Sequence, residues 1–69
     1  MKSRIAQLRK EQKLSQEELA SAVRVTRQTI TSLETGKYTA SLVLAYKIAR
    51  FFHSSIEEIF DFSEIKEEQ

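Results

Sequence analysis

Apolar residues recur every three or four positions along most of the 69-residue chain. This period is typical of amphipathic helices. The pattern predicts four helices and a short fifth one, at residues 2–12, 16–23, 27–35, 42–52 and after Ser55. Side chains on the inner faces of these helices are predicted to form the core, among them Ile5, Leu8, Leu44, Ala45, Ile48, Ala49, Phe52, Ile56, Ile59 and Phe60. The fold class is therefore all-α, a compact five-helix domain.

Short polar residues mark the helix ends. Ser15 and Glu18 have the spacing of a capping box, in which each side chain satisfies the other's backbone N–H. Thr26, Ser41 and Ser55 are predicted as further N-caps, and Gly36, the single glycine, stands where a helix C-cap is expected. The stretch FDFSEI at residues 60–65 alternates apolar and polar side chains, which is compatible with a short C-terminal strand.

The charge is divided unevenly along the chain. Residues 1–50 carry ten Lys or Arg and four Asp or Glu, whereas residues 51–69 carry one Lys and six Asp or Glu. This asymmetry indicates a basic working surface and an acidic end, although solvated helix faces would give the same counts. No proline or second glycine marks a linker, so residues 1–62 are predicted as one domain, followed by a short acidic tail at 63–69.

Several classes of function lack the residues they would need. The chain has no cysteine, one histidine, no glycine-rich phosphate loop and no plausible pair of buried carboxylates. We therefore expect no catalytic site, no metal and no cofactor. No apolar run has the length of a membrane span or the character of a signal peptide, which predicts a cytoplasmic protein without a membrane or small-molecule partner.

The helices at 16–23 and 27–35 are joined by a turn of about three residues and form a helix–turn–helix. Two helices that cross over so short a turn need a small residue near the crossing, and Ala20 supplies it. Larger apolar residues are predicted to fill the angle between the helices: Leu19, Val23, Val25, Ile30 and Leu33.

The segments LSQEELA, VTRQTI, LETGK and IEEIF resemble, in order and spacing, the phage-repressor-type helix–turn–helix family, also called Cro/cI or XRE-type. The resemblance covers residues 4–60 and is strongest to short stand-alone bacterial regulators of the cytolysin-repressor type. It implies a lambda-repressor-like DNA-binding fold and a sequence-specific transcriptional regulator that acts as a repressor. An antitoxin or anti-repressor on the same fold is the alternative.

Two positions depart from the family pattern. Arg24 stands where the turn often has glycine, so it must adopt a left-handed backbone or another kind of turn. Ala40 replaces a frequent proline after the second helix of the motif, so a looser loop is expected there.

The outer face of the helix at 27–35 is polar. Arg27 and Gln28 lie near its start, where a recognition helix contacts base edges, and Thr31 and Ser32 share that face. Arg27 could bridge O6 and N7 of guanine, and Gln28 could bridge N6 and N7 of adenine. A solvated helix face is the alternative, although such a face is usually richer in Glu, Lys and Ala.

Other side chains are predicted to hold the DNA backbone or to fix the reading helix. Gln16 opens a helix, where free N–H groups favour a phosphate, and Lys37 and Tyr38 follow the reading helix. An ordinary helix-start residue, a solvated lysine and a packed tyrosine are the alternatives. The resemblance implies an ion pair between Arg9 and Glu34, against two separately solvated charges.

The resemblance also implies a two-fold homodimer on a near-palindromic site in double-stranded DNA. Four apolar residues near the acidic end, Ile56, Ile59, Phe60 and Phe62, are predicted to form its interface. The alternative is a monomer in which these side chains complete the core.

Overall fold

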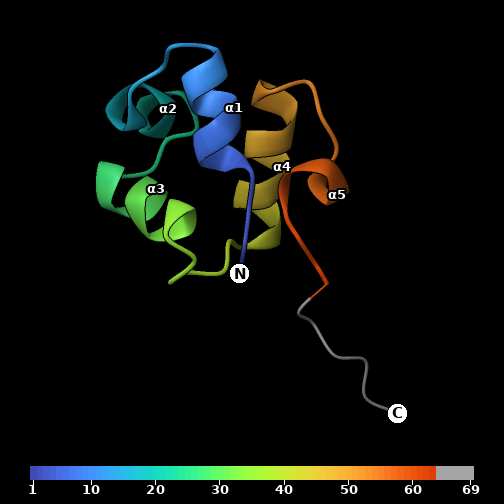
Figure 1. Ribbon diagram of the computed structural model, residues 1–69. Coiled ribbons are helices and arrows are strands. Elements are labelled where there is room, and N and C mark those ends of the chain that lie inside the picture. The colour runs from blue at the N-terminus through green and yellow to red at the C-terminus, as the bar shows by residue number, and fades with distance from the viewer. Residues whose placement is uncertain (64–69) are drawn as a thin grey trace.

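The computed structural model describes residues 1–63 and is all-helical, as predicted. Its elements are α1 (Ile5–Glu11), α2 (Gln16–Ala22), α3 (Arg27–Glu34), α4 (Leu42–Phe51) and α5 (Ile56–Ile59). Helix α2 packs on α3, α1 contacts α3, and α4 contacts α5. In Figure 1, α1 stands between the α2–α3 pair and the α4–α5 pair. None of these helices is long and apolar enough to cross a membrane.

The predicted N-caps are confirmed. The side chains of Ser15, Thr26, Ser41 and Ser55 each accept a hydrogen bond from the backbone N–H three residues further on. Ser15 and Glu18 form the predicted capping box, and Ser55 forms a second one. Because these bonds satisfy N–H groups that the helix itself cannot, the four helix starts lie where the sequence places them.

The first four helices all end in the same way, with a left-handed residue two positions after the last helical one. These residues are Lys13 (φ 58°), Arg24 (φ 61°), Gly36 (φ 79°) and His53 (φ 55°). After α2, for example, the N–H of Arg24 donates to Ser21 O at 3.3 Å and that of Val25 donates to Ala20 O at 2.9 Å. This is the Schellman arrangement, and glycine is the residue that adopts it without a steric penalty. The ends of α1, α2 and α4, where this residue is not glycine, therefore carry a steric penalty.

Replacing His53 with glycine is expected to raise the free energy of unfolding by about 0.5–1 kcal/mol. A left-handed residue with a Cβ costs about 1–2 kcal/mol, and the greater freedom of glycine in the unfolded chain cancels part of the gain. Urea denaturation measures the difference, with His53→Ala as the control because it keeps the Cβ. Equal stability of the two variants would contradict the prediction.

The chain before α1 differs from the prediction of a helix at 2–12. The N–H of Arg4 donates to Ile59 O at 2.7 Å, and Lys2 O accepts from the N–H of Asp61 at 2.9 Å. Ser3 and Phe60 thereby form an isolated antiparallel bridge. Residues 2–4 thus lie outside the helix, with Arg4 forming a bend at φ −102° and ψ 17°, and within residues 1–63 this bridge replaces the predicted strand. The rest of that stretch, 64–65, and the remainder of the acidic tail, 66–69, lie outside the described residues.

The core unites all five helices. Most of the apolar side chains predicted on the inner faces are buried, and Leu8, Val25 and Ile56 are half-buried at the edge of the core. The buried side chains are Ile5, Leu19, Ala20, Val23, Ile30, Leu33, Leu44, Ala45, Ile48, Ala49, Phe52, Ile59 and Phe60. Ile59 is 1% exposed and Phe60 is 4% exposed. The prediction that these two form a dimer interface is therefore wrong, because both are used within their own chain.

Candidate nucleic-acid interface

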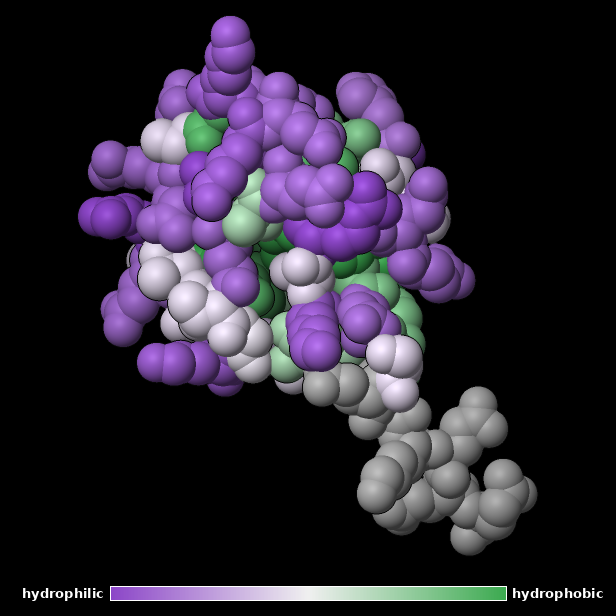
Figure 2. Space-filling model, in the orientation of Figure 1, coloured by the Kyte–Doolittle hydropathy of each residue, from purple (hydrophilic) through white to green (hydrophobic). Residues whose placement is uncertain are grey.

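Helix α3 is held by its apolar side and turns its polar side outward. Ile30 and Leu33 are buried, whereas Arg27 and Gln28 are exposed at the start of the helix. In Figure 2, weakly polar side chains gather at the lower left, over α3. The face that the sequence predicts as the DNA-reading face is thus open to solvent at its first turn.

A shallow hollow lies beside this face and brings together residues from α3 and from the loop that follows it. Gln28 and Ser32 line it from the helix, and Lys37 and Tyr38 line it from the loop. Tyr38 is 44% exposed, so its ring is not simply packed into the core. Predicted base-reading and phosphate-binding side chains therefore share one concave surface, open to a ligand.

Thr29, for which the sequence suggests no role, also lines this hollow. Its N–H donates to the hydroxyl of Thr26 at 3.3 Å, and the two hydroxyl oxygens are 3.1 Å apart. Thr29 therefore strengthens the N-cap that fixes the start of α3.

An ion pair holds α3 to α1. The guanidinium of Arg9 donates two hydrogen bonds to the carboxylate of Glu34, from Nε to Oε2 at 2.7 Å and from Nη2 to Oε1 at 3.1 Å. Its Nη1 also donates to Leu14 O at 2.8 Å. The two side chains are only 12% and 7% exposed, so the paired geometry is shielded from water. The structure thus brings Arg9 and Glu34 together and ties them to the loop before α2.

Gln16 links this pair to α2. Its Nε2 donates to Glu34 Oε1 at 2.9 Å, and its Oε1 accepts from the hydroxyl of Thr31 at 3.1 Å. Arg27 Nε also donates to that oxygen, over 3.5 Å. We call Arg9, Glu34, Gln16 and Thr31 the polar network. Sequence reasoning missed the Gln16 link, because a contact between two helices leaves no local spacing signal.

The network leaves limited freedom to two predicted DNA contacts. The hydroxyl oxygen of Thr31 lies 3.1 Å from both Gln16 Oε1 and Arg27 O, and these two acceptors share its single hydrogen, so its methyl group and its oxygen lone pairs are what it can offer to a base. Gln16 retains one amide hydrogen and lies in the first turn of α2, where backbone N–H groups are free. Thr31 and Ser32 are half-buried, unlike Arg27 and Gln28.

The electrostatics of the network favour the charged pair. Burial alone would raise the pKa of Glu34, but hydrogen bonds from Arg9 and Gln16 and the positive charges of Arg9 and Lys10 outweigh burial and lower it. The bond to Glu34 likewise raises the pKa of Arg9 against the effect of burial. Glu34 therefore stays ionised, and its negative charge is compensated by Arg9. The positive charges of Arg27 and Lys37 on the outer side of α3 are not compensated by it. Among residues 1–63, no cluster of His, Asp or Glu is arranged to hold a metal ion.

Comparison with known proteins gives consistent matches. Residues 5–59 match a family model described as helix-turn-helix. An uncharacterized HTH-type transcriptional regulator of Archaeoglobus fulgidus is 55% identical over 64 residues, covering 93% of this chain and 90% of the relative. Another from Bacillus subtilis is 43% identical over 60 residues, covering 87% and 91%. Among solved structures, the restriction-modification controller protein C.AhdI from Aeromonas hydrophila is similar with a TM-score of 0.75 and 33% identity, covering 83% of this chain and 86% of that chain.

Proposed function

Because this chain belongs to the XRE-type helix-turn-helix family of transcriptional regulators, we propose that it represses transcription by occupying a near-palindromic operator as a homodimer. One observation carries the proposal: the exposed first turn of α3 presents Arg27 and Gln28 beside the hollow that contains Lys37 and Tyr38. Groups that can read bases and groups that can hold phosphates thus lie on one surface.

Base reading is assigned to the outer side of α3. Arg27 and Gln28 are exposed there, and each has the bidentate geometry that matches one purine edge in the major groove. Ser32 lies one turn further along, on the wall of the hollow, and reaches a neighbouring base. Thr31, whose hydroxyl donates to Gln16, contributes a methyl contact. The polar network fixes the angle at which these side chains enter the groove.

Backbone contacts are assigned to both flanks of α3. Lys37 and Tyr38 hold one phosphate strand from the loop after α3. Gln16, at the start of α2, holds another through its free amide hydrogen and the backbone N–H groups of that first turn. These contacts set the register of the domain on the duplex, and the base contacts set the sequence.

Selection of bound duplexes from a random DNA pool tests the proposal most directly. We expect enrichment of an inverted repeat whose half-sites are about 10 base pairs apart, the spacing that places two recognition helices on one side of the duplex. Failure to enrich any sequence would contradict specific recognition. Enrichment of a single half-site without symmetry would contradict the dimer.

The dimer surface needs residues that the protomer leaves exposed. Leu42 is 78% exposed, Val43 64% and Phe62 42%, and Leu42 and Phe62 line a hollow whose wall includes the half-buried Ile56. We call Leu42, Ile56 and Phe62 the apolar patch. The proposed contact between two copies uses the apolar patch. Ile56 and Phe62 were predicted from the sequence as interface residues, and Leu42 is added by the structure.

Replacing Leu42 with aspartate is expected to raise the dimer dissociation constant at least about 100-fold. Burial of a leucine side chain stabilises by about 1.5–3 kcal/mol, and in a two-fold dimer both copies lose this contribution. Sedimentation equilibrium without DNA measures the change, with Ser21→Asp as the control because Ser21 is exposed on α2. An unchanged dimer, or a wild-type chain that is monomeric at tens of micromolar, would contradict the proposed surface.

A further inference from the structure

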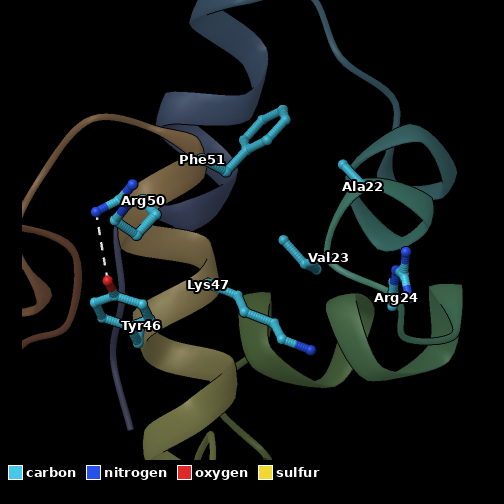
Figure 3. A pocket seen from close by; sticks show the side chains of 7 residues that line it. All are labelled: Ala22, Val23, Arg24, Tyr46, Lys47, Arg50 and Phe51. Carbon is cyan, nitrogen blue, oxygen red and sulfur yellow. Dashed lines mark hydrogen bonds between the residues drawn. The ribbon is translucent and has the colours of Figure 1, made fainter.

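A second concave surface lies between the end of α2 and the outer side of α4, away from the hollow beside α3. It has a volume of about 630 Å³ and opens to solvent. Figure 3 shows its side chains: Val23 lies in the middle, Tyr46 and Phe51 come from α4, and the cationic Arg24, Lys47 and Arg50 lie around Val23. None of its lining residues belongs to α3. We call this surface the basic groove.

The basic groove is positively charged throughout. Arg24, Lys47 and Arg50 are all exposed, and no acidic residue of the described part of the chain, 1–63, lines the groove. Among residues 1–63 the ion pair present is Arg9–Glu34, so none of the three cations has a carboxylate within salt-bridge distance there. Three like charges on one open surface create a local field that attracts anionic groups.

The floor of the groove is apolar. Val23 is buried, Phe51 is half-buried and Tyr46 is 54% exposed. Arg50 is held above this floor, because its Nη1 donates to the hydroxyl of Tyr46 at 3.4 Å and its guanidinium carbon lies 5.8 Å from the ring centre. Figure 3 marks the hydrogen bond as a dashed line. Aromatic side chains beside cations, one of which is held by Tyr46, form the pattern of an interface anchor rather than of a plain solvated surface.

We propose that the basic groove docks an acidic amphipathic segment of a partner protein. Carboxylates of the segment pair with Arg24, Lys47 and Arg50, and one of its apolar or aromatic side chains packs on Tyr46 and Phe51. This goes beyond the proposed operator binding. Duplex DNA would match the charges but would bring no apolar group to the floor. A second copy would have to insert its acidic end into the groove of the first, whereas the proposed dimer contact lies on the apolar patch.

The probe is a fluorescent synthetic helix-forming peptide of about twelve residues, with Glu and Asp on one face and Leu and Phe on the other. A comparison peptide carries Ser in place of Leu and Phe. Anisotropy titration of the full chain is expected to show saturable binding of the first peptide with a dissociation constant below about 1 mM. The comparison peptide is expected to bind at least about tenfold more weakly, since it cannot cover the floor.

Two variants of the chain locate the site. Lys47→Glu is expected to weaken peptide binding at least about tenfold, whereas the matched control Lys2→Glu, which removes a lysine beside Asp61, changes it less than about twofold. Arg24→Gly is expected to weaken peptide binding while raising the melting temperature, because it removes both a cation and a strained backbone. Weaker binding by this variant therefore cannot be attributed to misfolding.

Four results would overturn the proposal. The first is that the apolar acidic peptide does not bind up to about 1 mM, and the second is that both peptides bind equally, which would show a plain anion site. The third is that Lys47→Glu weakens binding to random-sequence duplex DNA more than Lys2→Glu does, which would assign the groove to the DNA backbone. The fourth is that Lys47→Glu alters self-association in sedimentation, which would make a second copy the occupant.

Discussion

Replacing Glu34 with glutamine is expected to lower the free energy of unfolding by about 3 kcal/mol, because it leaves the shielded guanidinium of Arg9 without its counter-charge. A chain of this size has a total stability of roughly 3–10 kcal/mol, so the loss would be a large share of it. Urea denaturation measures the change. The control is Glu17→Gln, an exposed glutamate in the first turn of α2, whose effect is expected to stay within about 0.5 kcal/mol.

The pH dependence of stability gives a second measure of the same pair. The pKa of Glu34 is lower in the folded chain than its ordinary value of 4.5, since hydrogen bonds from Arg9 and Gln16 and nearby positive charges outweigh burial. A carboxyl group with a lowered folded-state pKa adds stability that is complete above its unfolded-state pKa and is lost as the pH falls through the folded-state value. The wild-type chain should therefore lose stability below about pH 4.5 more steeply than Glu34→Gln does.

A double-mutant cycle separates the pair from its surroundings. Replacing Arg9 with methionine and Glu34 with leucine together is expected to be less destabilising than the two single losses combined, because neither charge is left unpaired. If Glu34→Gln were no more destabilising than Glu17→Gln, the ion pair would not be what fixes α3 against α1.

Replacing Gln28 with alanine is expected to weaken binding to the selected operator by about 1–3 kcal/mol and to relax the preference at one base pair in each half-site. Gln28 is exposed at the start of α3, so its removal should leave the stability of the domain unchanged. Competition binding with operators changed at single positions measures both the loss and its place in the site.

Lys37→Ala is the matched control, because Lys37 lines the same hollow but is assigned to a phosphate. It should weaken binding to all sequences equally and lower the slope of log affinity against log salt by about 1. If both variants bound the selected operator as the wild-type chain does, the assignment of this face to DNA would be wrong.

Sequence alone determined where most helices begin and end. The starts of α2, α3, α4 and α5 follow from their caps, since the bonds between a cap side chain and the N–H three residues later are made within one turn. The start of α1 was misplaced for the opposite reason. Residues 2–4 bond to the last residue of α5 and to Asp61 after it, far away in sequence, and a helical pattern carries no trace of these partners.

The candidate site was predicted in parts and assembled only by the fold. Helical periodicity sorted the inner and outer faces of α3, and the family resemblance suggested Arg9 and Glu34 as partners. Gln16, predicted as a phosphate ligand, lies between Glu34 and Thr31. Its position depends on the crossing of α2 and α3, so spacing along either helix could not reveal it.

The tertiary structure decided which apolar side chains remain available to a partner. Residues 56–62 contain four large apolar groups, and their sequence does not say which of them face the rest of the chain. The bridge between Ser3 and Phe60 draws Ile59 and Phe60 into the core and leaves Phe62 exposed. The sequence by itself determined the helices and their polar and apolar faces, because those depend on bonds and periodicity within a few residues. Burial depends on which segments meet in space, and so only the folded chain could remove Ile59 and Phe60 from the proposed dimer contact and add Leu42 to it.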